Sequence, residues 1–316
     1  MADMVFSGVT FTGGYSIAIP APPPTGTQKA IFGYGNGDGD PATNVSTTNL
    51  VSNTGVVATN TTGVGTARSY LAAAGYGSDK AIFGYGIIAG YTNVSITNLV
   101  SNTGVVATDT TGVGTARQSP AATGYGSDKA IFGYGNSGGT VSITNLVSNT
   151  GVVGNDVTGV GTARQALAAA GYGSSGQAIF GYGVTSSIKY SITNLVSNTG
   201  VVATDTTGVG TARNNLAAAG YGTDKAIFGY GITASSVTAI TNLVSNTGVV
   251  ANDTAGVGTA RQGLAAAGYG TDKAIFGYGG GSSPSNLVSN TGVVANDIST
   301  VGSARQLLAA AGYSLT

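Results

Sequence analysis

The sequence predicts an all-β protein, a six-bladed β-propeller of four-stranded antiparallel blades. The sequence motif AIFGYG recurs six times at a period of about 50 residues, which indicates one structural unit stacked on copies of itself. Each copy holds four short apolar runs separated by turn residues, as expected for an antiparallel sheet. The first and last copies are incomplete in complementary ways, which predicts a closed ring. The repeats are marked by their phenylalanines, Phe32, Phe83, Phe132, Phe180, Phe228 and Phe276.

The second copy shows how one unit is organised. LAAAGYG and AIFGYG flank a short turn, VSITNLVS follows a variable stretch, and the hairpin signal SNTG introduces the fourth run. LAAA could begin a helix by propensity, but it is short and followed by glycine, which favours a strand. Its small side chains suit the innermost strand, where neighbouring sheets converge. The expected strands are 71–77, 81–86, 94–101 and 105–111, and a glycine-rich connection ends the unit at Arg117.

The two ends of the array predict how the ring closes. The array opens at Lys29 with the second strand of a unit and stops at Leu308–Tyr313 with the first strand of a unit. We therefore expect the C-terminal strand to join the N-terminal blade, which removes the exposed ends of a linear array. Residues 1–28 are expected to form an extended arm with a Pro-rich linker, and residues 29–316 the propeller.

The composition excludes several classes of function. Charged residues make up only 8% of the chain and the net charge is zero, so no nucleic-acid partner is expected. His, Cys and Glu are absent, which excludes a nucleophile with a His base and a His or thiolate zinc site. We expect no enzyme activity, no cofactor and no metal. The N-terminus lacks a basic region and a continuous apolar run, so neither a signal peptide nor membrane insertion is expected.

The copies differ mainly in two connections, the one between the second and third strands and the one after each arginine. Strand direction alternates, so both should emerge on one face, while the nearly constant turns GYGSDK and SNTG should emerge on the other. Loops on a rigid scaffold commonly carry recognition, although tolerated drift would produce the same variation. The candidate binding residues on this variable face are Asp38, Asp40, Tyr70, Ile87, Ile88, Tyr91, Lys189 and Tyr190.

Other motifs have mainly structural interpretations. Lysines beside aspartates in the first turn, as in Asp79–Lys80, are typical of solvated hairpin turns. The six arginines could line an anion site at the mouth of the ring, but backbone hydrogen bonds that tie one blade to the next are favoured. NGDGD at Asn36–Asp40 is a weak calcium signal, because it lacks the length and the Glu of a calcium loop. The repeated Phe and Tyr are expected in the core rather than as stacking platforms for sugars or bases.

The N-terminal arm alternates loosely between apolar and polar residues and is followed by the stiff spacer PAPPP. Such a segment suits strand addition to a neighbouring subunit, whereas a frayed end is the alternative. The residues expected to make this assembly contact are Val5, Phe6, Val9, Phe11, Tyr15, Ile17 and Ile19.

Two resemblances extend this interpretation. The glycine mark FGYG and the arginine before each inner strand resemble kelch repeats across residues 29–313, although Trp is absent and the aromatic pair of that family is replaced by Leu50 and Val57. The leader MVFSGVTFTGGYSIAIPAPPP resembles the start of structural proteins of tailed marine bacteriophages.

The phage resemblance implies a virion protein of the tail, fibre or particle surface. Such a protein would bind other virion proteins through its arm and would present the propeller to a host surface glycan or protein. A free carbohydrate-binding lectin is the alternative.

Overall fold

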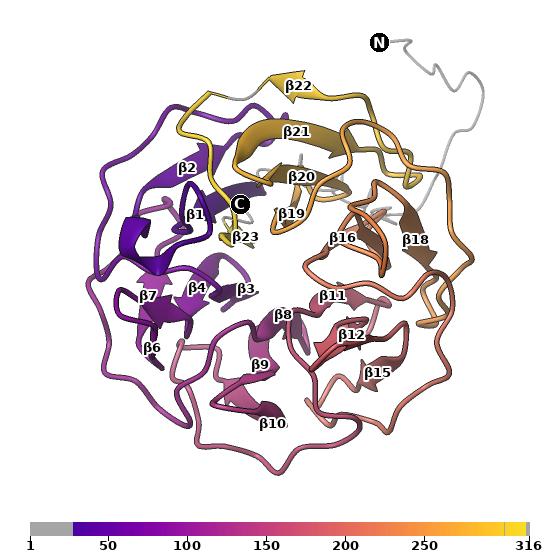
Figure 1. Ribbon diagram of the computed structural model, residues 1–316, viewed down its shortest axis with the longest axis horizontal. Coiled ribbons are helices and arrows are strands. Elements are labelled where there is room, and N and C mark those ends of the chain that lie inside the picture. The colour runs from indigo at the N-terminus through magenta and orange to yellow at the C-terminus, as the bar shows by residue number, and fades with distance from the viewer. Residues whose placement is uncertain (1–27, 300, 314–316) are drawn as a thin grey trace, which may run out of the picture.

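The computed structural model describes residues 28–299 and 301–313, and the fold in these ranges is all-β. Six antiparallel sheets of three or four strands, here named A to F in chain order, surround a common centre (Figure 1). Within the described ranges the helical content is a single three-residue 3₁₀ turn, η1 (Pro41–Thr43). No helix in these ranges has the length and hydropathy needed to cross a membrane.

Three strands recur in every sheet, in the order expected from the repeat. The strand with small side chains is innermost, AIFG is second and TNLV or its equivalent is third (Figure 1). LAAA is therefore a strand and not a helix. The inner strands of sheets A to F are β23 (Ala309–Tyr313), β3 (Ala72–Tyr76), β8 (Ala121–Tyr125), β11 (Ala168–Tyr172), β16 (Ala217–Tyr221) and β19 (Ala265–Tyr269). The second strands are β1 (Lys29–Gly33), β4 (Lys80–Gly84), β9 (Lys129–Asn136), β12 (Gln177–Gly181), β17 (Lys225–Gly229) and β20 (Lys273–Gly279). The third strands are β2 (Thr48–Val51), β7 (Thr97–Val100), β10 (Thr140–Val147), β15 (Thr193–Val196), β18 (Thr241–Val244) and β21 (Ser282–Val288).

Sheet A combines the two ends of the described chain. β23 pairs antiparallel with β1 over five residue pairs, from Lys29 opposite Tyr313 to Gly33 opposite Ala309. β1 pairs on its other side with β2. The C-terminal strand thus occupies the inner position beside the N-terminal strand.

The expectation of four strands in every sheet is wrong in part. Among the residues that the structure describes, only sheet F has a fourth strand, β22 (Ile298–Ser299), which pairs with β21. In the other units the segment after SNTG meets the third strand through isolated bridges, such as Val100 with Val106. Backbone hydrogen bonds remain there, such as the one from the Ala107 N–H to the Leu99 carbonyl at 2.8 Å, and the side chain of Asn98 of β7 adds another by donating to the carbonyl of Ala107 at 3.0 Å. A further two-stranded hairpin rises from sheet B, β5 (Ile87–Ile88) with β6 (Thr92–Asn93), and another from sheet D, β13 (Val184–Thr185) with β14 (Ile188–Lys189).

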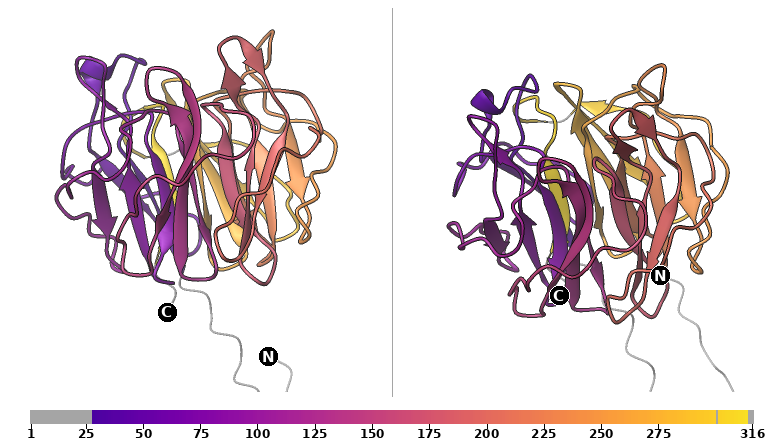
Figure 2. Two further views of the ribbon diagram at one scale, coloured as in Figure 1. Left: turned by 90° about the horizontal axis from the view of Figure 1, so that it is seen from below. Right: turned by 60° about the horizontal axis from the view of Figure 1, so that its bottom comes forward.

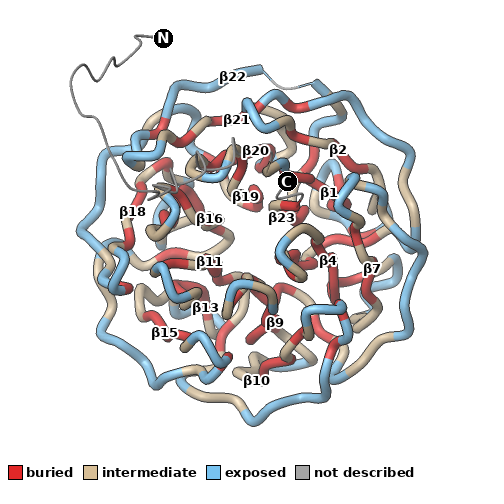
Figure 3. The backbone as a smooth tube through the Cα atoms, turned by 180° about the vertical axis from the view of Figure 1, so that it is seen from behind, coloured by how far each residue is buried: buried red, intermediate tan, exposed pale blue. Residues whose placement is uncertain are grey.

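The core lies between adjacent sheets, and exposed residues occupy the loops and the outermost chain (Figure 3). The repeated aromatic residues are buried there, as expected. Phe83 of sheet B packs edge-on against Tyr34 from sheet A, with ring centroids 5.1 Å apart. Glycine is needed beside this pair, because a Cβ on Gly33 would stand 2.7 Å from the Phe83 ring. Equivalent aromatic contacts occur at all six interfaces.

The strands run between two faces of the disc, seen edge-on in Figure 2. The turns after the inner strands converge on one face, here called the constant face, where they line a common cavity. The connections that precede the inner strands converge on the opposite face, the variable face. Packing explains why the constant turns do not vary. A Cβ on Gly151 of the SNTG turn, for example, would lie 2.9 Å from the ring of Tyr76 on the neighbouring sheet.

Candidate functional site

Each repeat arginine is buried between two sheets and contacts both of them. Arg68 lies over the Tyr34 ring of sheet A, with its Cζ 4.4 Å from the ring centroid. Its Nε donates to the carbonyl of Tyr85 and its Nη2 to Asn98 Oδ1, both in sheet B, at 2.9 and 2.7 Å. With no exposed surface, Arg68 is unavailable to an anion at the mouth of the ring. The tying role expected of the arginines is therefore confirmed.

A carboxylate from the following sheet completes this contact. Asp109 Oδ2 accepts hydrogen bonds from the backbone N–H and the hydroxyl of Thr66, and Asp109 Oδ1 accepts from Asn98 Nδ2. Burial raises the pKa of Asp109, but the hydrogen bonds from Thr66 and Asn98 outweigh burial and hold the pKa below its ordinary value. We name the GVGTA segment, residues 63–67 in this repeat, the strap; it is held by the next sheet.

Six backbone hydrogen bonds form one continuous loop around the axis on the variable face. The N–H of each residue donates to the carbonyl of its counterpart in the preceding unit, and Tyr70 donates to Leu307, at distances of 2.6 to 3.1 Å. All six residues have positive φ, between 52° and 65°. They surround a shallow hollow of about 70 Å³. The members are Tyr70, Ser119, Ala166, Asn215, Gly263 and Leu307.

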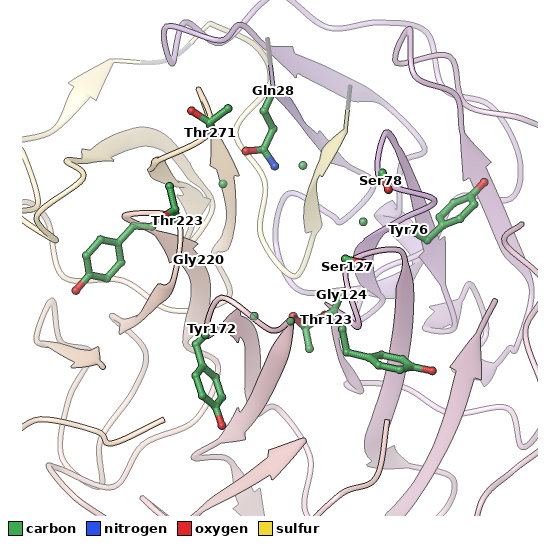
Figure 4. A pocket seen from close by; sticks show the side chains of 18 of the residues that line it. Gln28, Tyr76, Ser78, Thr123, Gly124, Ser127, Tyr172, Gly220, Thr223 and Thr271 are labelled. Carbon is green, nitrogen blue, oxygen red and sulfur yellow. Dashed lines mark hydrogen bonds between the residues drawn. The ribbon is translucent and has the colours of Figure 1, made fainter. Parts of the chain in front are cut away.

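The centre of the constant face is a cavity of about 380 Å³ (Figure 4). Hydroxyl residues of the constant turns, such as Ser78 and Thr223, stand around its rim, and the tyrosines, such as Tyr172, point away from it. Gln28, the first described residue, projects its side chain into the cavity. Tyr313, at the other end of the described chain, also lines it. Both ends of the described chain therefore lie at the central cavity of the constant face.

Six of the eight candidate binding residues come from adjoining loops on the variable face. The loop that carries Asp38 and Asp40 leads through η1 to Asn44, whose Nδ2 donates to the carbonyl of Ile87 at 2.9 Å. Ile87 also forms a bridge with Ser69, next to Tyr70. We name this region the A–B sector; it comprises Asp38, Asp40, Tyr70, Ile87, Ile88 and Tyr91.

The acidic loop of the A–B sector is braced by its own carboxylates. Asp38 Oδ1 accepts from the Thr43 hydroxyl and from the N–H of Asp40, and the pKa of Asp38 is lowered by these two hydrogen bonds. Asp40 Oδ1 caps η1 by accepting from the N–H of Ala42. Both carboxylates are exposed. No group of three or more metal-ligating side chains of the His, Cys, Asp and Glu types occurs within the described residues.

Tyr91 and Tyr70 make the A–B sector aromatic. Tyr91 is 70% exposed at the tip of the β5–β6 hairpin and has a φ of 58°, which is unusual for a bulky residue. Tyr70 is half-buried beside the axial hollow. Burial raises the pKa of Tyr70, and the nearby Tyr91 raises it further. Ile88 is half-buried next to them, whereas Ile87 is buried and serves the core.

Lys189 and Tyr190 lie at the β13–β14 hairpin, which rises from sheet D, apart from the A–B sector. Lys189 Nζ donates to the backbone carbonyls of Ile232 and Thr233 in the next unit. Desolvation lowers the pKa of Lys189. Its ammonium therefore ties two units together, a role that the sequence analysis did not anticipate.

The remaining sequence expectations concern the constant turns and the arm. Asp79 and Lys80 form an ion pair at 2.5 Å within one turn, and the same pair recurs in three other units. These charges therefore pair with each other, as turn chemistry predicts. The assembly residues Val5, Phe6, Val9, Phe11, Tyr15, Ile17 and Ile19 lie outside the described residues.

No protein-family model matches this chain, and no curated protein is similar to it. The kelch and bacteriophage resemblances therefore rest on the sequence motifs alone.

Proposed function

We propose that the chain is a non-enzymatic structural protein of a virus particle, a closed six-bladed propeller that is attached through its N-terminal arm and presents its variable face outward. The observation that carries this proposal is the position of Gln28. It lines the central cavity of the constant face, on the side of the disc opposite the A–B sector. Attachment and recognition would thus use opposite faces of the disc.

Two features support the closed ring. β23 pairs with β1, so the end of the array completes its first sheet. The loop of six hydrogen bonds passes through Tyr70 and Leu307 without a gap, which joins the last unit to the first at the axis. At five of the six contacts between units, the arginine also donates to both a tyrosine carbonyl and an asparagine side chain of the next unit.

The arm can be tested by truncation. A chain that begins at residue 28 should fold and melt like the full chain, because the described contacts of the ring begin there. It should fail to enter purified particles, measured by mass spectrometry of particles assembled with either form. Equal incorporation of both forms would contradict attachment through the arm, and absence of the full chain from particles would contradict the virion assignment.

Carbohydrate recognition by the A–B sector is the second candidate function. Its support is the exposed Tyr91 beside Tyr70, since an aromatic ring with a polar tip suits an amphipathic ligand at a wet surface. The exposed carboxylates of Asp38 and Asp40 could accept hydrogen bonds from sugar hydroxyls.

A glycan array tests this candidate with the full chain. Tyr91→Ala should abolish any signal without changing the melting temperature. Ile188→Ala removes a comparably exposed apolar residue from the hairpin of sheet D and should leave the signal unchanged. An array with no signal for the parent chain, or a signal that Tyr91→Ala leaves intact, would reject recognition of sugars at this sector.

A further inference from the structure

The contact between sheets F and A differs from the other five contacts. At the position of the strap-binding aspartate, sheet A carries Asn60, and Ser303 stands in place of the strap threonine. Asn60 Oδ1 accepts from the Ser303 N–H at 3.2 Å, and Asn60 Nδ2 donates to the Ser303 hydroxyl at 2.8 Å. The five aspartates bind their straps with ionised acceptors, which make stronger hydrogen bonds than a neutral amide. The five positions are Asp109, Asp156, Asp205, Asp253 and Asp297.

The arginine of this contact is also less well bound. The other five arginines donate from Nε to a tyrosine carbonyl at 2.7 to 2.9 Å. Arg305 Nε is buried and has no hydrogen-bond partner among the described residues. Its Nη1 reaches the Ser303 carbonyl only at 3.5 Å, so its one short hydrogen bond is to Asn49 Oδ1. A buried guanidinium with an unsatisfied donor is costly.

The tyrosine of this contact lacks a partner as well. Tyr34 and its counterparts in the next four units donate their hydroxyls to the carbonyl of a strap valine, at 3.0 to 3.2 Å. The hydroxyl of Tyr278 is buried without a partner among the described residues. Three kinds of tie present at the other contacts are therefore weakened or missing at the F–A contact.

The weakest contact adjoins the one place where the ring has no covalent continuity, which lies inside sheet A between β1 and β23. β1 and β23 are joined by hydrogen bonds and apolar packing but by no hairpin turn, whereas the inner and second strands of the other sheets are connected by the chain. Ala30 and Phe32 of β1 pack with Ala265 and Tyr269 of sheet F in one apolar cluster. If β1 and β2 separate from β23, they therefore also separate from sheet F. This separation breaks the hydrogen bond from Arg305 to Asn49 of β2.

We propose that the ring has a single opening point, at which β1 and β2 leave β23 and sheet F while the four contacts among sheets B to F stay closed. Asn60 and Ser303 set this point, because they replace the charge-assisted strap contact. This inference rests on the closed ring proposed above. It makes the disc a protein that opens locally before it unfolds, as expected where contacts are fewest.

Hydrogen–deuterium exchange of the full chain, read by mass spectrometry, tests the proposal without any substitution. The repeats serve as internal controls, because the second strands share the sequence AIFG and have nearly equal intrinsic exchange rates. Peptides that extend into the variable loops distinguish the copies by mass. Residues 29–51 and 301–313 should exchange at least about tenfold faster than the equivalent strands of sheets B to E.

Two double variants test the cause. Asn60→Asp with Ser303→Thr restores the strap contact and should slow exchange of residues 29–51 to within about twofold of the other sheets. Asp156→Asn with Thr115→Ser places the equivalents of Asn60 and Ser303 at the contact between sheets B and C. There the inner and second strands, β8 and β9, are connected by a hairpin turn. This variant should lower the midpoint of urea unfolding but leave residues 29–51 as the first to exchange.

The outcomes separate this proposal from the ring itself. Equal exchange in all six sheets, fastest exchange in another sheet, or no slowing by the restoring variant would overturn the opening point while leaving the ring intact. Complete exchange of β1 and β23 at the earliest time, in the parent and in the restoring variant alike, would overturn both the closed ring and the inference.

Discussion

Replacing one interface arginine by lysine measures how much the fold depends on these contacts between sheets. Arg117 is fully buried and donates to the carbonyl of Tyr134, the carbonyl of Thr115 and Asn145 Oδ1, at 2.8, 3.1 and 2.7 Å. A lysine ammonium keeps the charge but cannot reach all three acceptors, because it lacks the planar fork. Two acceptors then lose their partner at about 1–3 kcal/mol each, so Arg117→Lys should lower the free energy of unfolding by about 2–6 kcal/mol.

Arg305→Lys is the matched control, since it makes the same change at the F–A contact. Arg305 has a single short hydrogen bond, to Asn49, which a lysine could retain, so the expected loss is about 0–2 kcal/mol. Urea unfolding followed by far-ultraviolet circular dichroism gives both values. A loss at Arg305 equal to or greater than that at Arg117 would refute the idea that the two contacts differ.

Two further predictions concern packing and pH. Gly84→Ala should destabilise the fold by about 1–3 kcal/mol, because its Cβ would lie 2.8 Å from the Phe132 ring, whereas Gly139→Ala has open space and should be neutral; thermal melts of both variants check this. The lowered pKa of Asp109 means that its contribution to stability is present above the unfolded value of about 3.9 and is lost as pH falls through the folded value. Asp109→Asn should therefore be less stable than the parent chain at pH 7, and it should lose less further stability below pH 4. Urea unfolding at a series of pH values measures both effects. Equal pH dependence of the free energy of unfolding in the two proteins would contradict the assigned role of the carboxylate.

The repeat pattern was sufficient to predict most of the sheet architecture. AIFG, LAAAGY and TNLV form strands in the expected order because each apolar run is bounded by turn residues and is too short for a stable helix. The pairing of β23 with β1 also follows from the incomplete first and last copies. The fourth strand was predicted only in part, because the outer segment meets the third strand through separate backbone bridges and an asparagine side chain rather than through a continuous ladder.

The variable face was harder to predict, since its contacts join residues far apart in the chain. The sequence shows that Lys189 is unusual, but not that its ammonium reaches Ile232 and Thr233. The proximity of Tyr70 and Tyr91 likewise depends on how two connections of one unit fold over each other. The sequence also shows that Asn60 is the one residue of the six equivalent positions that is not aspartate. It does not show that the side chain at this position binds the strap of the preceding unit.

The loop of hydrogen bonds at the axis also fixes how many repeats the protein can have. Each step from one backbone N–H to the next carbonyl crosses one unit, and six steps return to Tyr70. A duplicated or lost copy would not simply lengthen or shorten the molecule, as it would in a linear array. It would strain or break this circle of hydrogen bonds, so selection on such a gene should tolerate change within the outer connections far more readily than change in copy number.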